Sequence, residues 1–299
     1  MRFHSGEREV QERAGVRHFA DEVGEGISDS ILPRMDQFLE QSKMAVLGTV
    51  DSQSGAWASV AAGDQGFIHV LDRKTITITA HPADSDPVFE NLSRQGHAAL
   101  LAVDFATGRR VRLNGLGLFT HGKIRIEAGE VYGNCLRYVQ QRVLLGLRRS
   151  LFALEDRVER SPVLSVDQQR LISRADTFFF HSQRSSAAKG DMSHKGGNPG
   201  FILASSGRQI VFPDCNGNRM FNTLRNITDN PNAGLPFIDF DGGRTLQITG
   251  RAVIDWDARR AQLFPGAERV IDYEVAKVIH HDCGFPLVSS FQRFSRFNP

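Results

Sequence analysis

Cations, hydroxyl groups and glycines are concentrated in residues 190–222, which read GDMSHKGGNPGFILASSGRQIVFPDCNGNRMFN. Ser193, His194 and Lys195 stand directly before two glycines, which allow a backbone to approach a ligand ring closely. Lys195 could meet a phosphate, and His194 could donate to a ring carbonyl or relay a proton. This combination favours a cradle for a flat, phosphorylated ligand over a decorated surface turn.

The end of the same stretch predicts an anion site at the start of a helix. An Asn-Gly turn comes before Asn218, a favourable N-cap residue, and an Asn-Pro pair at 230–231 ends the helix. Free N–H groups and the helix dipole favour an anion at such a start. Arg219, in the first turn, is unfavourable beside the positive end of the dipole unless a phosphate lies between them.

The elements that must position these residues occur twice in the chain. Stretches beginning at Gly66 and Gly200 share one order: strand, short helix, strand, glycine-containing turn and strand. The anchor pairs are Gly66/Gly200, Phe67/Phe201, Phe89/Phe221, Asp104/Asp239, Phe105/Phe240, Gly108/Gly243 and Gly115/Gly250. We interpret this as an internal duplication. It predicts a mainly β protein with helices (α+β), in which two tandem barrels of antiparallel strands form an intrachain pseudo-dimer.

We expect three parts in the chain. Residues 1–30 form an N-terminal helical arm, residues 31–160 form the first copy with a trailing helix, and residues 161–299 form the second copy. The trailing helix is predicted after Asn134 because apolar residues then recur at helical spacing. These residues are Leu136, Val139, Val143, Leu144 and Leu147.

Composition restricts the compartment and the partners. The 299 residues are 40% hydrophobic and 23% charged with a net charge of +2, which gives no strong attraction to nucleic acid. The three cysteines are widely spaced and form no CxxC pair, so we expect no disulfide framework and no metal site. The adjacent residues His280–Cys283 could not all face one metal. No apolar run suits a signal peptide or a membrane span, so we expect a cytoplasmic protein.

Several segments together resemble the pyridoxamine 5′-phosphate oxidase-like, FMN-binding split-barrel family. They are SHKGGNPGF, FPDCNGNRMFNTLRNI, NPNAGLPFIDF and LQITGRA, and FHSGEREVQERAG and VYGNCLRYVQ are similar to segments of its two-copy members. The resemblance covers most of the chain and is strongest from about residue 170 to 255. It implies a six-stranded antiparallel split barrel, with FMN held where two barrels meet and its phosphate near the helix start.

The resemblance also implies which residues hold FMN. Asn218 and Arg219 occupy the phosphate positions, but Met220 replaces the family's second cation, so Lys195 or another cation must substitute. Residues 199–202 would form the strand along the isoalloxazine ring, and the end of the next strand would lie beside the ribityl chain. The expected FMN site comprises Ser193, His194, Lys195, Pro199, Gly200, Phe201, Phe212, Pro213, Asp214, Asn218 and Arg219.

The first copy differs where the second carries Arg219. Its helix start, HPADSDPVFENL, has Asp84, Asp86 and Glu90 and no lysine or arginine, so it would repel a phosphate. We therefore expect one FMN per chain. Trp57, together with Ser59, is the first copy's candidate for the opposite wall, because an indole can pack on a flavin.

The predicted function is that of an FMN-dependent oxidoreductase between a nicotinamide donor, NAD(P)H, and a small acceptor, with His194 as the candidate acid. True pyridoxamine phosphate oxidases of the family carry a C-terminal Arg-x-His pair, which GFPLVSSFQRFSRFNP lacks, so we do not expect that activity. Three alternatives stay open: a non-catalytic flavin carrier or sensor, a barrel that binds a deazaflavin or haem, and a barrel without ligand. Pairing of two chains into a homodimer also stays open.

Overall fold

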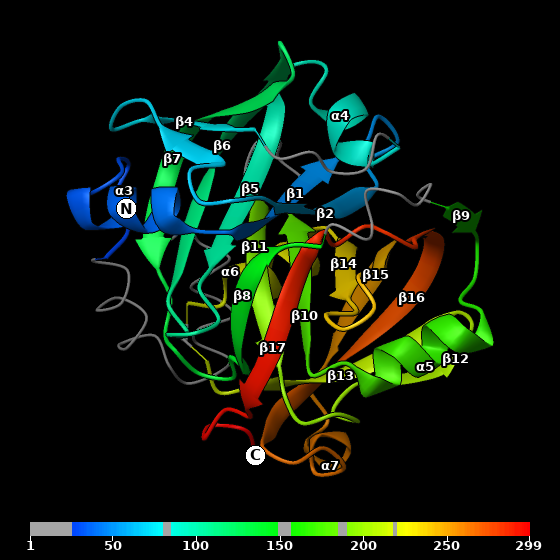
Figure 1. Cartoon of the computed structure of the whole chain (residues 1–299). Helices are drawn as coiled ribbons and strands as arrows, with labels where there is room; N and C mark the ends of the chain where they lie inside the picture. Colours follow the sequence, from blue (N-terminus) through cyan, green and yellow to red (C-terminus); the bar gives the residue numbers. More distant parts are fainter. Residues whose placement is uncertain (1–25, 80–84, 149–156, 185–189, 218–219) are drawn as a thin grey trace.

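The computed structural model describes five ranges of the chain and is made largely of antiparallel strands (Figure 1). The described residues are 26–79, 85–148, 157–184, 190–217 and 220–299. Most of the predicted N-terminal arm, residues 1–25, lies outside them. Within the described ranges no helix is both long and apolar enough to cross a membrane.

The first half of the chain forms a seven-stranded sheet in the order β2-β1-β5-β6-β7-β4-β3. Strands β1 and β5 are almost wholly buried, which fits their nearly continuous apolar sequences MAVLGTV and GHAALLAV. The elements are α3 (Pro33–Gln41), β1 (Met44–Val50), β2 (Ala56–Ala62), β3 (Ile68–Val70), β4 (Thr75–Ile78), α4 (Pro87–Asn91), β5 (Gly96–Val103), β6 (Arg110–Thr120) and β7 (Lys123–Gly133).

The second half forms an eight-stranded sheet in the order β11-β10-β14-β15-β16-β13-β12, with β9 paired to β16. Three phenylalanines in a row make β10 apolar on both of its faces. The elements are β9 (Val158–Ser161), α5 (Val166–Arg174), β10 (Thr177–Gln183), β11 (Gly190–Gly196), β12 (Leu203–Ser206), β13 (Gln209–Cys215), α6 (Asn222–Asp229), β14 (Asn232–Ile238), β15 (Thr245–Asp255), α7 (Ala258–Ala261) and β16 (Ala267–His281).

Corresponding elements follow the same order in both sheets, from the helix before the first strand to the last strand. One hydrogen bond also recurs. Asn91 Nδ2, in α4, donates to Thr49 Oγ1 at 2.9 Å, and Asn226 Nδ2, in α6, donates to Ser182 Oγ at 3.1 Å. The sequence repeat therefore coincides with a repeat of strand order.

The two asparagines also correct the alignment of the helices. Phe89 lies inside α4, whereas Phe221 comes just before α6 and has a positive φ of 62°. The anchor pair Phe89/Phe221 of the sequence repeat is therefore wrong. Asn91 and Asn226 are the equivalent positions, because each one ties its helix to the first strand of its own sheet.

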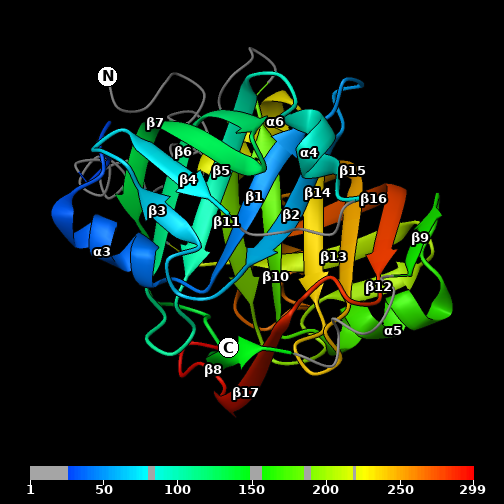
Figure 2. The same cartoon turned by 45° about the horizontal axis from the view of Figure 1, so that its top comes forward.

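The two sheets pack on each other through β2, β10, β11 and β14 (Figure 2). A shared apolar cluster joins them and includes Val46 of the first sheet and Phe179 and Met192 of the second. A Cβ added at Gly234 of β14 would lie 2.8 Å from the carbonyl oxygen of Ala56 in β2, so the close approach of these strands requires glycine.

The trailing helix predicted after Asn134 is wrong. Residues Gln141–Leu147 form strand β8, which pairs with β17 (Leu287–Arg293) as a two-stranded ribbon (Figure 1). The pairing partner supplies hydrogen bonds that outweigh the helical spacing of the leucines, and Tyr138 has a φ of 63°, which interrupts any helix there. Because β17 comes from the C-terminal part of the chain, the ribbon also ties the two predicted copies together.

Candidate functional site

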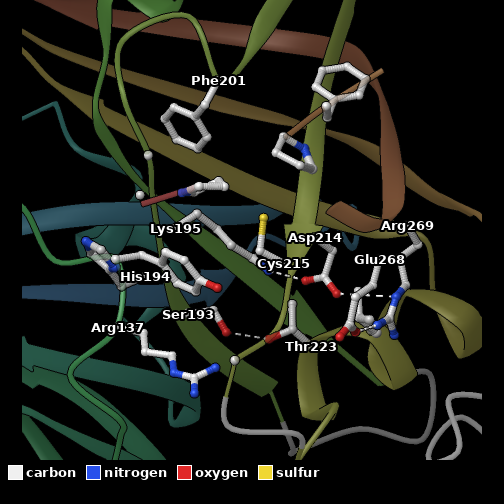
Figure 3. A pocket seen from close by; sticks show the side chains of 18 of the residues that line it. Arg137, Ser193, His194, Lys195, Phe201, Asp214, Cys215, Thr223, Glu268 and Arg269 are labelled. Atoms are coloured by element: carbon white, nitrogen blue, oxygen red, sulfur yellow. Dashed lines mark hydrogen bonds and ion pairs between the residues drawn. The ribbon is translucent and has the colours of Figure 1, made fainter. Parts of the chain in front are cut away.

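A pocket of about 420 Å³ is formed jointly by the two halves of the chain (Figure 3). The second half contributes the ends of β11 and β13 and the start of α6, and the first half contributes the beginning of β6 and residues 134–138. The volume lies in the range of roughly 300–1,000 Å³ typical of small-molecule sites.

A buried ion pair between the sheets fixes one wall of the pocket. Arg112 Nη1, from β6, lies 2.6 Å from Asp191 Oδ2, in β11, and Arg112 Nη2 donates to Ser193 Oγ at 2.9 Å. Tyr132 Oη donates to Asp191 Oδ1 at 2.8 Å. Burial alone would lower the pKa of Arg112, but the Asp191 carboxylate raises it above its usual value. Ser193 Oγ then lies 2.6 Å from Thr223 Oγ1, at the start of α6.

Arg110, two residues earlier in β6, is a buried cation without a carboxylate partner among the described residues. Its Nη2 donates to the carbonyl oxygens of Cys135 and Arg137, and its Nε has no hydrogen bond. Burial lowers the pKa of Arg110 to about 10, although the group stays protonated at neutral pH. Because buried charges are normally paired, a pocket beside Arg110 is suited to an anion.

Lys195 is held in an ion pair across the middle of the pocket. Its Nζ lies 2.6 Å from Asp214 Oδ1, and Arg269 Nε lies 3.6 Å from Asp214 Oδ2 (Figure 3). Arg269 also pairs with Glu268. The charges in this group largely balance, so Lys195 is not the uncommitted phosphate-binding cation that the sequence predicts.

Residues 134–138 of the first half close over the turn after β13. Tyr138 Oη donates to the carbonyl oxygen of Asn216 at 2.9 Å, and Arg137 Nη1 donates to the same oxygen at 3.2 Å. Close to the same edge, Asn298 Nδ2 donates to Asn198 Oδ1 at 2.9 Å. The rim of the pocket is thus built from three distant parts of the sequence.

Most of the residues expected from the sequence lie in this pocket. Those that line it are Ser193, His194, Lys195, Pro199, Gly200, Phe201, Pro213 and Asp214. Phe212 does not: it is fully buried in the core of the second sheet, where its ring packs against Phe178 and Phe180. Asn218 and Arg219 lie outside the described residues.

Trp57 is not at the pocket, contrary to expectation. It is buried in β2, and its Nε1 donates to Asp51 Oδ2 at 2.9 Å within the same half of the chain. The neighbouring Ser59 hydroxyl donates to Asp86. The side chains of Trp57 and Ser59 both lie in the packed interior, because β2 is buried along its whole length against the second half of the chain.

The His194 ring points away from the polar wall of the pocket. Side chains alternate along β11, so His194 faces the opposite side from Ser193 and Lys195 and packs edge-on against Phe105 and Phe179. Burial, together with nearby arginines, lowers the pKa of His194 well below its usual value, and neither ring nitrogen has a hydrogen bond. The geometry therefore does not support the predicted role as an acid at the ligand.

The local structure differs from expectation at two further places. Helix α6 begins at Asn222, and Phe221 in a left-handed conformation occupies its N-cap position, so Asn218 is not the cap. Residues 199–202 form a turn and a bend rather than a strand, and β12 begins only at Leu203. In this turn Gly200 has a φ of 92°, a conformation that glycine adopts without steric cost.

The equivalent position in the first half is filled by its own side chains. Asp86 caps α4 by accepting from Val88 N at 2.8 Å and from the Ser59 hydroxyl. Gln247 Nε2, from the second sheet, donates to Asp86 Oδ2 at 2.8 Å. Burial raises the pKa of Asp86. Gln247, in β15, is the counterpart of Arg112, in β6: each reaches the other sheet, Gln247 at the start of α4 and Arg112 at β11.

Sequence reasoning missed the contribution of the first half to the pocket. The residues concerned are Arg110, Arg112, Arg137 and Tyr138. One signal was present: RRVRLNG places arginines at alternate positions of a strand that is otherwise apolar, which puts two of them on one face. The partners of Arg112 lie about 80 residues away and those of Arg110 about 25, so neither set can be read from that stretch alone.

No protein-family model matches the sequence, and a search of curated proteins gives no match. Solved structures with a similar fold include HupZ from Group A Streptococcus, at 12% identity and a TM-score of 0.33 over 41% of this chain and 98% of that chain. A putative pyridoxamine 5′-phosphate oxidase from Lactobacillus delbrueckii matches at 12% identity and 0.31, over 40% and 94%. An FMN-binding protein from Syntrophomonas wolfei matches at 8% and 0.29, over 38% and 84%.

Proposed function

We propose that the pocket binds FMN and that the protein is a flavoprotein. The observation that carries the proposal is the buried Arg110 guanidinium, which faces the pocket without a carboxylate partner among the described residues. An FMN phosphate would supply the missing negative charge. Arg110 would also be the substitute for the cation that Met220 replaces.

The remaining lining suits the other parts of FMN. The hydroxyl groups of Ser193 and Thr223 line the pocket and would exchange the hydrogen bond between them for one to a phosphate or ribityl oxygen, and Phe201, Pro199 and Pro213 offer apolar faces to the ring. Bound FMN would supply reversible electron transfer, while the protein places the ring and excludes water. Asn218 and Arg219 remain proposed phosphate contacts.

We further propose an oxidoreductase that takes electrons from a nicotinamide donor. His194 favours a second candidate, a flavin carrier or sensor, because its ring packs edge-on against Phe105 and Phe179 and burial lowers its pKa, which makes it a poor acid at the ligand. Both candidates require bound flavin, and they differ only in turnover.

The experiment is an absorption spectrum of the purified protein, followed by anaerobic addition of NADH or NADPH. A flavin spectrum, with FMN released on denaturation, supports the proposal, and bleaching by the nicotinamide supports the oxidoreductase. Flavin that is bound but never reduced identifies the carrier. Protein that is colourless and takes up no added FMN would exclude both, and uptake of a deazaflavin or haem instead would identify the remaining alternatives.

The architecture that best accounts for such a site is two tandem split barrels in one chain. The shared strand order and the paired asparagine contacts of α4 and α6 support an origin by internal duplication. The pocket would then correspond to one of the two ligand positions of a dimer.

A further inference from the structure

The mouth of the pocket is lined by exposed apolar side chains. Leu203, at the start of β12, and Leu263, just after α7, line the pocket with 46% and 76% of their surface exposed. Phe264 and Pro265 line it beside them. Exposed apolar side chains that gather at a cavity are typical of a surface that a ligand covers.

The two ends of the pocket have different chemistry (Figure 3). Phe201 lies at one end, Arg137 and Thr223 lie at the other, and the pair formed by Lys195 and Asp214 lies between them. FMN with its phosphate near Arg110 and its ring against Phe201 would leave the four apolar residues of the mouth to a second molecule.

The cations nearest the mouth are already paired. Lys195 is 2.6 Å from Asp214, and Arg269 contacts both Asp214 and Glu268. Among the described residues, a phosphate or carboxylate on the second molecule would therefore meet Asp214 and Glu268, which already pair with the neighbouring cations. An uncharged ring meets no such penalty, and it gains from covering the exposed leucines.

We propose that this mouth, defined by Leu203, Leu263, Phe264 and Pro265, is a second subsite for an uncharged planar ring compound. The proposal rests on the proposed function, because it names the substrate class of the same site. It assigns to the protein an apolar cyclic substrate without phosphate or carboxylate.

Two ring compounds of nearly equal shape test the proposal. Binding of 2-methyl-1,4-naphthoquinone, which is neutral, and of 1,4-naphthoquinone-2-sulfonate, which is anionic, is measured by calorimetry with and without FMN. We expect the neutral quinone to bind at least about tenfold more tightly, the effect of one unfavourable charge contact. Equal affinity, or tighter binding of the sulfonate, would overturn the proposal.

Substitutions of the two leucines at the mouth test whether the neutral quinone binds there. Leu203→Glu and Leu263→Glu should each weaken binding of the neutral quinone about tenfold, and both side chains are exposed enough to be replaced without unfolding. Val253→Glu, in β15, is the matched control because Val253 is 59% exposed and does not line the pocket. Unchanged quinone affinity in both leucine variants would refute the subsite.

The failures of the two proposals are distinguishable. FMN affinity is measured separately, by quenching of flavin fluorescence, and should be unchanged in both leucine variants. Protein that binds no FMN contradicts the proposed function and, because the second subsite rests on it, the substrate class too. Normal FMN binding without selective binding of the neutral quinone contradicts the second subsite alone.

Discussion

Arg112 and Asp191 join the two sheets through an ion pair of 2.6 Å in which both side chains are buried. Arg112→Met should lower the free energy of unfolding by about 3–5 kcal/mol, because it leaves a buried carboxylate without its partner. Urea denaturation measures the change. Lys74→Met, which breaks the exposed pair with Asp29, is the control and should change the stability little. A cost below that of Lys74→Met would contradict the structural role of Arg112.

Replacing Arg110 should weaken FMN binding and leave stability almost unchanged, whereas replacing Arg112 should lower stability. Arg110→Met removes a buried charge that has no carboxylate partner among the described residues, so stability should change little while FMN affinity falls about ten- to a hundredfold. Fluorescence titration with FMN measures the loss. Arg109→Met, at an exposed neighbouring cation, should leave the affinity unchanged. If the two variants bind FMN equally well, another group holds the phosphate.

Replacing His194 should change the stability of the protein at acid pH and leave its affinity for FMN unchanged. Because its folded-state pKa is well below 6.5, the unfolded chain takes up a proton that the folded chain does not, and stability falls as the pH drops below about 6.5. His194→Phe should reduce this loss, which is at most about 1.4 kcal/mol per pH unit, and should retain FMN binding. His181, whose pKa burial lowers to about 4, accounts for part of the remainder.

Urea unfolding at several pH values between 4 and 7 provides the test for His194. His121→Asn, at an exposed turn, serves as the control. A profile for His194→Phe that coincides with that of the unmodified protein would show that folding does not lower the pKa of His194. Loss of FMN binding in this variant would instead restore the histidine to the ligand site.

Asp86 should give the reverse pH dependence. Burial raises its folded-state pKa above 3.8, so the unfolded chain releases a proton more readily, and this contribution to stability is lost as the pH rises above about 3.8. Asp86→Asn should remove the dependence, because an amide does not titrate. The Gln247 amide can turn to present its unbonded Oε1 to the new amide group. Unfolding of this variant and of the exposed control Asp241→Asn is compared at pH 4.5 and 7. Parallel profiles for Asp86→Asn and the unmodified protein would contradict the shift.

The chain should bind one FMN. The position equivalent to the pocket is occupied by the hydrogen bonds among Ser59, Asp86 and Gln247, which place a carboxylate where the phosphate would lie. Flavin released by denaturation is quantified against the protein concentration. A ratio near two would refute the difference between the halves.

The strands and the second-half residues of the pocket could be predicted because their signals are local. Alternation in TITITA and RQIVF, and the Gly-Gly pair before Phe201, depend on neighbours within a few residues. The ion pair of Lys195 with Asp214 could not be foreseen, since it joins two strands through their position in the sheet. Arg110 could not be predicted as a site residue for the same reason. What distinguishes it is that no carboxylate among the described residues pairs with it, and only the folded structure shows this.

The segment after Asn134 shows a different limit. Its leucines fit a helix, but β17 offers an edge with which β8 pairs, and that partner stands about 140 residues later. His194 was misjudged for a related reason: its residue type suggests chemistry, but the alternation along β11 decides which way the ring points.

Arg112 and Gln247 stand at equivalent places in the two sheets, and a single chain carries a separate codon for each of them. In an assembly of two identical subunits, any substitution at this place would appear on both sides at once. Linking the two sheets covalently removes that restriction. One side can retain the residues for a ligand, while the other is free to accumulate changes that only hold the molecule together.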